Sequence, residues 1–196
     1  MKGMFVVFEG IDGSGKSSVC ESLSARFDNV VVTYEPTKSK IGTLLRTMEL
    51  SRETEALLFV ADRADHTEKI KEWVADGKMV VCDRYYASTL AYQAAPLNGP
   101  ALSMEWLETL NNAVIVEPDI TFLMDIRPET GLSRVSSRGE TSKFEKQAYL
   151  EKVRENYLKI ANRKNFKIID AERPAKDVIK EVVETIEKWR KDNASV

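Results

Sequence analysis

The sequence predicts an α/β fold in three layers, with a five-stranded parallel sheet between two layers of helices. Short runs rich in β-branched and aromatic residues alternate along the chain with longer segments of helical periodicity. Strands that alternate with helices form right-handed crossovers, which make the strands parallel and cover both faces of the sheet. The glycine-rich segment Gly10–Ser17 lies between the first strand and the first helical pattern, at the edge where ligands bind in such folds.

The strands are predicted from apolar runs of strand length at Met4–Glu9, Val30–Tyr34, Met79–Asp83, Thr121–Asp125 and Phe166–Asp170. Helical spacing of apolar residues predicts helices at Ser17–Phe27, Ile41–Met48, Arg52–Asp76, Ser103–Val116, Pro128–Ser137, Phe144–Arg163 and Lys176–Asp192. Four strands end in an acid, and parallel strands end at one edge of their sheet. We therefore expect these acids to lie along that edge, near the glycine-rich segment: Glu9, Asp83, Asp125 and Asp170.

The length and composition predict one domain, residues 1–196, because 196 residues with 43% hydrophobic content suffice for a single core. The net charge is −2, and no basic tail is present, so we expect no nucleic acid polymer as a partner. The apolar runs are far shorter than the roughly 20 residues of a membrane span. The first ten residues lead directly into the glycine-rich segment, so we expect no membrane partner and a cytoplasmic location.

Residues 10–17, GIDGSGKS, match the pattern G-x-x-x-x-G-K-[ST] of a phosphate-binding P-loop. The glycines let successive backbone N–H groups point at phosphate oxygens, and the helix N-terminus adds partial positive charge. We expect Lys16 to reach the β- and γ-phosphates of a nucleoside triphosphate and the Ser17 hydroxyl to bind Mg²⁺. The residues predicted to bind the nucleotide are Gly10, Ile11, Asp12, Gly13, Ser14, Gly15, Lys16, Ser17 and Ser18.

A second set of motifs indicates the acceptor. Residues 83–93 read D-R-Y-x-x-S-x-x-A-Y-Q, Glu35-Pro36-Thr37 follows the second strand, and the long helix contains Phe59-x-x-x-Arg63. This combination resembles the thymidylate kinase family. The resemblance spans nearly the whole chain and continues through Arg138-Gly139-Glu140, Phe144-Glu145, Val153-Arg154, Tyr157-Leu158 and Ile169-Asp170-Ala171. It implies a P-loop kinase architecture, ATP as phosphate donor, Mg²⁺, dTMP as acceptor and a homodimer.

Phe59 and Arg63 are four residues apart and share one face of a helix. An aromatic ring there can stack on a pyrimidine while the guanidinium donates to its O4 carbonyl, and the matching residues of the family do this with thymine. The resemblance implies that Arg84 clamps the monophosphate, with Arg46 as an additional phosphate ligand. It places Ser88 and Thr89 beside the base, Tyr92 against the sugar 2′ position, Asp12 near the 3′ hydroxyl, and Glu35 among the substrate-binding residues.

The acceptor phosphate is largely a dianion at neutral pH, so we expect no general base. Cations must neutralise the transferring phosphoryl group: Lys16 and Mg²⁺ for the donor and Arg84 for the acceptor. Some family members carry an arginine within the P-loop, but this chain has Gly13 there and resembles the lid-dependent type. Its predicted lid is residues 138–143, with Arg138 and Lys143 as catalytic cations. The resemblance also implies that Arg134 packs against adenine opposite residues 171–173, and that Asp83 joins Ser17 at the metal.

Two other kinds of function stay open at this point. Another nucleoside monophosphate kinase or a nucleoside kinase of this fold would need a different base site, and an unphosphorylated acceptor would need a carboxylate base such as Glu9, Glu35 or Asp12. A GTPase switch or a non-catalytic nucleotide-binding module is disfavoured because residues 162–165, NRKN, lack the acid of the guanine-binding pattern N-K-x-D. The single histidine, His66, has no partner ligands in the pattern, and we interpret it as structural.

Overall fold

The computed structural model describes residues 3–97, 99–135 and 143–193 of the chain. At its centre lies a five-stranded, entirely parallel sheet of strand order β2-β3-β1-β4-β5. The strands are β1 (Met4–Glu9), β2 (Val30–Tyr34), β3 (Met79–Asp83), β4 (Ile120–Asp125) and β5 (Phe166–Asp170). The sheet that the sequence predicts is therefore confirmed, with β4 one residue longer at its start.

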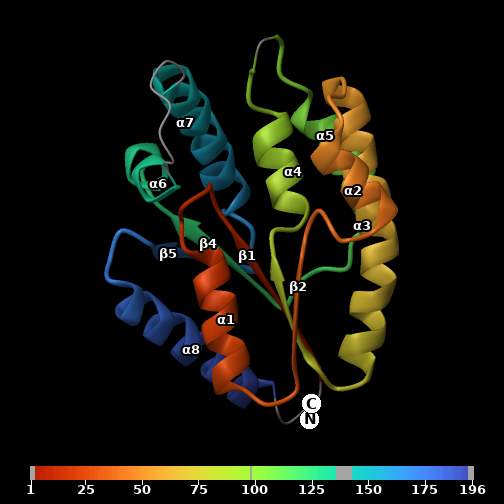
Figure 1. The fold of residues 1–196 in the computed structure, drawn as a ribbon. Coiled ribbons are helices and arrows are strands. Elements are labelled where there is room, and N and C mark those ends of the chain that lie inside the picture. The colour runs from red at the N-terminus through yellow and green to blue at the C-terminus, as the bar shows by residue number, and fades with distance from the viewer. Residues whose placement is uncertain (1–2, 98, 136–142, 194–196) are drawn as a thin grey trace.

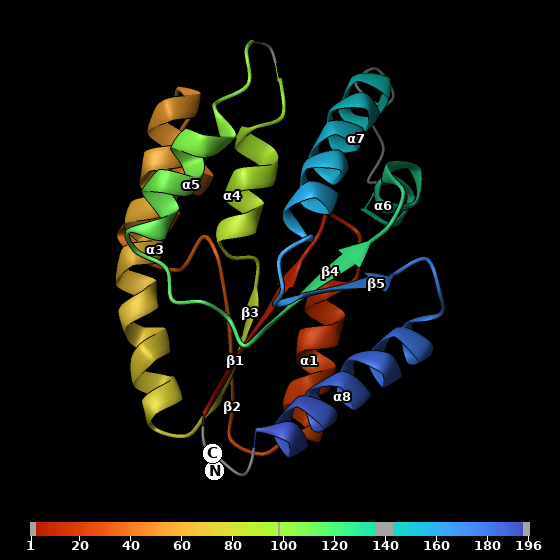
Figure 2. The same cartoon turned by 180° about the vertical axis from the view of Figure 1, so that it is seen from behind.

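Helices cover both faces of the sheet (Figure 1 and Figure 2). One face carries α1 (Lys16–Arg26) and α8 (Ala175–Asp192), and the other carries α3 (Arg52–Ala75), α4 (Tyr86–Gln93), α5 (Met104–Asn112) and α7 (Lys143–Ile160). The short helix α2 (Lys40–Thr47) packs on α3, and α6 (Pro128–Val135) packs beside α7. This arrangement confirms the three-layer fold.

The core lies between the sheet and its helices because the central strands are apolar on both sides. Every residue of β1 is buried, as is typical of a central strand in a parallel sheet. The rings of Phe8 and Phe122 stack across β1 and β4 with centroids 5.2 Å apart. Among the described residues, no helix is both long and apolar enough to cross a membrane.

The register places the carboxyl ends of the strands at one edge, the upper edge in Figure 1. Phe8 of β1 lies opposite Asp83 of β3, and Asp125 of β4 lies opposite Asp170 of β5. The acids that end four strands therefore share this edge, as predicted. Asp125 is engaged there in an ion pair with Arg154, at 2.6 and 2.7 Å, so it holds α7 to the sheet.

One helix was missed, and two helices end several residues earlier than predicted. Helix α7 ends at Ile160 instead of Arg163. Helix α4 was not predicted, because most of its residues are buried and it therefore lacks the alternating polar face by which a surface helix is recognised. Helix α5 ends at Asn112 instead of Val116. The N–H groups of Val114 and Ile115 both bond to the carbonyl of Asn111, so the chain turns before the β-branched run that follows.

Candidate active site

The glycine-rich loop joins β1 to α1 at the upper edge of the sheet. Gly13 (φ 78°) and Gly15 (φ 87°) have left-handed backbone conformations that favour glycine. A Cβ on Gly13 would lie 2.3 Å from the carbonyl oxygen of Gly131 in α6, so any side chain there would force α6 to move. No side chain caps the first turn of α1, and this leaves its N–H groups available for phosphate oxygens.

The Lys16 ammonium lies inside this loop. Its Nζ donates to the carbonyls of Gly10 (3.1 Å) and Ile11 (3.0 Å) and to Ser14 Oγ (3.2 Å). Burial and, secondly, repulsion by Arg84 lower the pKa of Lys16 to about 8. The three contacts are all to uncharged oxygens, so phosphate oxygens in the loop would offer the ammonium better partners.

Ser17 and Asp83, the two residues that the sequence predicts for a metal, are brought into contact by the fold. Ser17 Oγ donates to Asp83 Oδ2 over 2.7 Å, while Asp83 Oδ1 is buried without a hydrogen-bond partner in the described part of the chain. An unpartnered carboxylate oxygen beside a hydroxyl fits Mg²⁺ and its bound water. Residues 3–97, 99–135 and 143–193 contain no cluster of three His, Cys, Asp or Glu side chains that could hold a metal alone.

A cavity of about 790 Å³ opens above the P-loop. Its floor is the P-loop, and its sides are Arg134 and the segment after β5, lined by Ala171, Glu172, Arg173 and Pro174. The Arg134 guanidinium is anchored on the carbonyls of Ala171 (3.1 Å) and Gly13 (3.3 Å). The structure thus brings together Arg134 and residues 171–173, as the sequence predicts for the adenine side.

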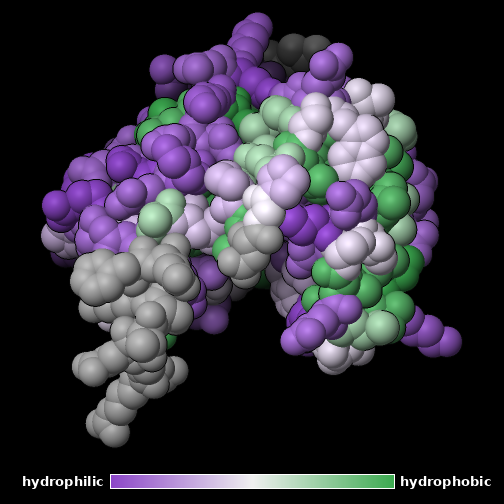
Figure 3. Space-filling view, turned by 90° about the horizontal axis from the view of Figure 1, so that it is seen from above, coloured by the Kyte–Doolittle hydropathy of each residue, from purple (hydrophilic) through white to green (hydrophobic). Residues whose placement is uncertain are grey.

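A second cavity of about 340 Å³ lies between α3, α4 and α7. It is lined by the residues predicted for the acceptor, namely Asp12, Glu35, Phe59, Arg63, Arg84, Ser88, Thr89 and Tyr92, and by others described below. Phe59 is half-buried and is not among the hydrophobic residues that pack on the core, so its ring is available to the cavity. Seen from above, the surface is hollowed between a mostly hydrophilic side and a side with more hydrophobic residues, where α2 and α3 lie (Figure 3).

Arg84 and Asp12 line both cavities. Arg84 Nη2 donates to Asp12 Oδ1 over 2.7 Å, and Nη1 donates to Ser88 Oγ over 3.1 Å. The guanidinium also lies over the Tyr92 ring, 5.2 Å from its centroid. Burial alone would lower the pKa of Arg84, but the surrounding acidic groups, led by Tyr92, Tyr157 and Asp12, raise it well above its usual value. A permanent cation therefore stands where the two cavities meet.

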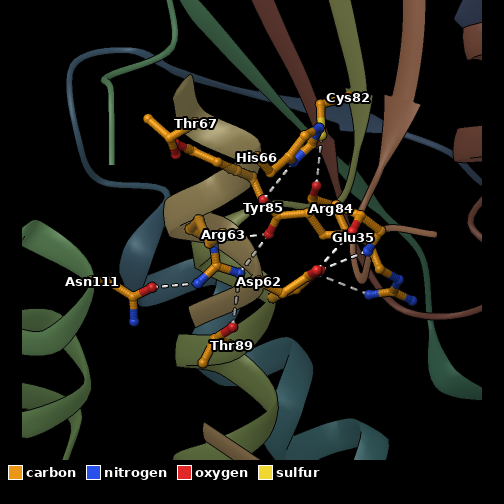
Figure 4. A network of polar contacts seen from close by, with 12 residues as sticks. Glu35, Asp62, Arg63, His66, Thr67, Cys82, Arg84, Tyr85, Thr89 and Asn111 are labelled. Carbon is orange, nitrogen blue, oxygen red and sulfur yellow. Dashed lines mark hydrogen bonds and ion pairs between the residues drawn. The ribbon is translucent and has the colours of Figure 1, made fainter. Parts of the chain in front are cut away.

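Arg63 lines this second cavity, which we call the acceptor cavity after the predicted role of its lining residues, and its side chain is 1% exposed. Figure 4 shows its contacts with Asn111 and Thr89. Arg63 Nε and Nη2 lie 2.8 and 2.7 Å from Glu35 Oε2, Nη2 also donates to Thr89 Oγ1 over 3.0 Å, and Nη1 donates to Asn111 Oδ1. The other oxygen of Glu35 contacts His66 Nδ1 at 2.9 Å. Glu35 thus neutralises and fixes the arginine.

Five predicted site residues are not placed in these cavities. Gly10 and Ile11 begin the P-loop but line neither cavity, and their carbonyls accept hydrogen bonds from Lys16. Arg46 does not line the acceptor cavity, because its guanidinium instead donates to the carbonyls of Pro36 (2.6 Å) and Thr37. It holds the Glu35-Pro36-Thr37 segment from outside. Arg138 lies outside the described residues, and so does the side chain of Lys143, the first residue of α7.

Sequence reasoning missed several residues that line the acceptor cavity. Arg52 donates to the carbonyls of Gln93 (2.7 Å) and Ala95 (2.6 Å), which fixes the end of α4. An arginine at the start of a helix gave no signal of this role in the sequence. Tyr149 was detectable in principle, because it lies eight residues before Tyr157 and so shares its helix face toward α4. Glu55, Gln93, Pro36, Tyr85 and Leu97 also line this cavity.

Glu9 is a fully buried carboxylate below both cavities. It accepts hydrogen bonds from the N–H groups of Tyr85 (2.9 Å) and Ser88 (3.1 Å) and from the hydroxyls of Ser88 (2.6 Å) and Tyr157 (3.1 Å). Burial raises its pKa above the ordinary value, and the hydrogen bonds and Arg84 offset this only in part. Because its oxygens are all engaged, Glu9 supports the segment after β3 and is not accessible to a substrate hydroxyl.

The raised pKa of Glu9 predicts a pH-dependent stability. Between the ordinary value of 4.5 and the raised value, the folded protein holds a proton that the unfolded chain has lost. The free energy of unfolding is therefore expected to fall with rising pH, by about 1.4 kcal/mol per pH unit within that interval. Glu9→Gln stays neutral and is expected to remove this fall. Urea unfolding at a series of pH values tests the prediction, and identical slopes in both proteins would contradict it.

Comparisons with known proteins agree with this geometry. Residues 8–182 match the family described as Thymidylate kinase. A protein named probable thymidylate kinase from Methanococcoides burtonii is 41% identical over 198 residues, covering 95% of this chain and 97% of the relative. A protein of the same name from Thermococcus kodakarensis is 42% identical over 204 residues, covering 94% of this chain and 97% of the relative. Another from Methanosarcina mazei is 40% identical over 199 residues, covering 95% of this chain and 96% of the relative.

Proposed function

Because this chain belongs to the thymidylate kinase family, we propose that it transfers the γ-phosphate of ATP to dTMP, giving dTDP and ADP. One observation carries the proposal: the P-loop cavity and the acceptor cavity meet at Arg84 and Asp12. Donor and acceptor bound in the two cavities would place their phosphates on either side of one permanent cation. This is the arrangement that direct phosphoryl transfer requires. The product leads toward the triphosphate used in DNA synthesis.

The acceptor cavity suits a pyrimidine deoxynucleotide. A guanidinium has five N–H groups, and the contacts of Arg63 with Glu35, Thr89 and Asn111 engage four of them in the described part of the chain. The fifth, on Nη1, is available to the O4 carbonyl of thymine, while Phe59 offers a ring for stacking. Tyr92 would crowd a ribose 2′ hydroxyl, and Ser88, Thr89 and Glu35 complete the wall of the cavity.

The chemistry needs no base from the protein. The acceptor oxygen of dTMP is largely deprotonated at neutral pH, since the second pKa of a phosphate monoester is near 6. Lys16 holds the donor phosphates, and Arg84 holds the acceptor phosphate in line with the γ-phosphate. Asp12, paired with Arg84, keeps that guanidinium directed across the junction and lies near the 3′ hydroxyl. Both cations neutralise charge that develops on the phosphoryl oxygens.

We propose Ser17 and Asp83 as the protein's contribution to a Mg²⁺ site. When bound there, Mg²⁺ would neutralise charge on the donor phosphates. The unpartnered Asp83 Oδ1 supports this assignment. Ser17 and Ser18 lie in the first turn of α1 and line the donor cavity. Arg134 with residues 171–173 would hold the adenine. Arg138 and Lys143 stay predictions as lid cations over the γ-phosphate, and the close contact of Gly13 with Gly131 favours a cation from outside the P-loop. The segment 138–143 belongs, in this proposal, to the same single domain, residues 1–196.

Other nucleoside monophosphates or nucleosides as acceptors are less well supported. An unphosphorylated acceptor would require a carboxylate free to act as a base. Glu9 is fully hydrogen-bonded, Glu35 is paired with Arg63 and His66, and Asp12 is paired with Arg84. A homodimer and a cytoplasmic location stay predictions from the family resemblance. Exposed hydrophobic side chains on and beside α2, such as Leu44 and Met48, are compatible with a dimer contact on that side.

The proposed function is tested by ADP release with ATP and Mg²⁺ for dTMP, dUMP, UMP, dCMP, dAMP, dGMP and thymidine as acceptors. We expect dTMP to have the highest kcat/KM. Arg63→Ala is expected to lower kcat/KM for dTMP by about 100-fold, because a charged hydrogen bond contributes about 1.5–3 kcal/mol and Glu35 loses its partner. Lys69→Ala, at an exposed position on the same helix, serves as the control. Preference for another acceptor would overturn the proposal.

A further inference from the structure

We propose that Asn111 is a positioning residue that directs Arg63 onto the acceptor base and thereby sets the discrimination of thymine from cytosine. The proposal rests on the proposed function for the identity of the base. Asn111 lies outside both cavities and would touch no substrate, so its effect must pass through Arg63.

The side-chain orientation of Asn111 is fixed by its own contacts. Asn111 is fully buried near the end of α5, where its Nδ2 donates to the carbonyl of Leu107 over 2.7 Å, one helical turn earlier. Its Oδ1 therefore faces Arg63 Nη1 (Figure 4). A guanidinium has only donors, so the reversed amide would place donor against donor at Arg63. The amide thus has one orientation that satisfies both neighbours.

The other contacts of Arg63 hold Nε, Nη2 and one face of the guanidinium, and none of them touches Nη1. Glu35 binds Nε and Nη2, Thr89 binds Nη2, and the Tyr85 ring covers one face of the guanidinium with its centroid 5.4 Å away. Only Asn111, among the described residues, holds Nη1. Since one N–H of Nη1 is taken by Asn111, the planar geometry fixes the direction of the other. That remaining N–H is the donor proposed to meet the base.

The direction of one donor is sufficient to read the base. Thymine presents a carbonyl oxygen at its 4-position, which accepts a hydrogen bond, whereas cytosine presents an amino group, which donates one. A correctly oriented N–H of Arg63 forms a hydrogen bond with the thymine carbonyl. The same N–H has no acceptor when cytosine is bound, so cytosine binds less well. Without Asn111 the guanidinium is held only on its Nε and Nη2 side, so the whole group can tilt, or a trapped water can bind Nη1. Both effects reduce this difference.

The test is the ratio of kcat/KM for dTMP to kcat/KM for dCMP. Asn111→Leu, which keeps similar volume and removes the acceptor, is expected to lower the ratio about tenfold. The KM for ATP is expected to stay unchanged, which a general loss of structure would not allow.

Asn112→Leu, at an exposed neighbouring position, should leave the ratio unchanged. Asn111→Asp retains an acceptor oxygen and is expected to keep most of the discrimination. If Asn111→Leu does not fold, Asn111→Ala takes its place.

A double-variant cycle decides whether Asn111 acts through Arg63. In the Arg63→Ala background, Asn111→Leu is expected to change the ratio no further. An unchanged ratio in the single variant, or an equal fall in both backgrounds, would overturn the proposal.

A second readout needs no substrate. Side-chain NMR of the ligand-free protein should show two separate Nη1 proton signals for Arg63, assigned with Arg63→Lys, because Asn111 hinders rotation of that group. The signals are expected to merge in Asn111→Leu, and signals that stay separate would contradict the proposal. If the wild-type chain phosphorylates neither nucleotide, the proposed function fails, while this readout still decides whether Asn111 holds Arg63.

Discussion

Replacing Arg84 with alanine is expected to lower kcat for dTMP phosphorylation by a factor on the order of 10²–10³, as for the loss of a donor that stabilises transition-state charge. Arg84 is the cation that lines both cavities, and no other described arginine or lysine does so. Its hydrogen bonds to Asp12 and Ser88 fix its direction in the ligand-free protein, so no reorganisation is needed when the phosphates arrive. Steady-state kinetics with ATP and dTMP measure the effect.

The Arg84 prediction has two controls. Arg84→Lys keeps the charge but replaces the planar fork with a single ammonium, and is expected to recover part of the rate. Arg26→Ala, exposed in the last turn of α1 and far from the P-loop, should leave kcat unchanged. A loss in Arg84→Ala confined to the KM for dTMP would show that Arg84 binds the substrate without acting in the transition state.

Replacing Lys16 with methionine is expected to lower kcat/KM for ATP by a factor on the order of 10²–10³, since this buried ammonium is the cation that we propose for the donor phosphates. The substitution keeps the length of the side chain and removes the charge. Lys188→Met, at an exposed position on α8, is the matched control. An effect of less than threefold would contradict the role assigned to Lys16.

The lowered pKa of Lys16 adds a pH dependence to this prediction. Burial is the main cause that brings it to about 8, so the ligand-free protein loses the positive charge of Lys16 as the pH rises through that value. Since kcat/KM reports the free enzyme, kcat/KM for ATP is expected to fall above about pH 8. In Lys16→Arg the guanidinium stays charged, and the fall should disappear. A wild-type profile that stays flat to pH 9.5 would contradict this account.

The sheet and most helices could be predicted from the sequence because their signals are local. Central strands such as β1 are continuous apolar runs, and Gly10–Ser17 separates strand from helix by its composition. Helix α4 was missed because it is buried on most sides, so its pattern carries no period. The motifs also identified residues that gather in one cavity, since Phe59 and Arg63 share one helix face and Arg84 and Tyr92 lie within one motif.

The rest of the site depends on contacts between distant segments, which no local pattern records. Asn111 reaches Arg63 across 48 positions of sequence, and Arg52 reaches Gln93 across 41. Arg46 shows the converse. The family resemblance implied that it binds phosphate, whereas in the structure its guanidinium donates to the carbonyls of Pro36 and Thr37. Burial and hydrogen bonding of this kind are decided by the tertiary fold.

The central claim is that the two cavities sharing Arg84 form one site, in which the γ-phosphate passes directly from ATP to dTMP. ATP labelled on its γ-phosphate, incubated with the protein, Mg²⁺ and dTMP, tests it most directly. The account predicts one labelled dTDP for each ADP formed, with little labelled inorganic phosphate. Label released mainly as inorganic phosphate, or ADP formed at the same rate without dTMP, would contradict it.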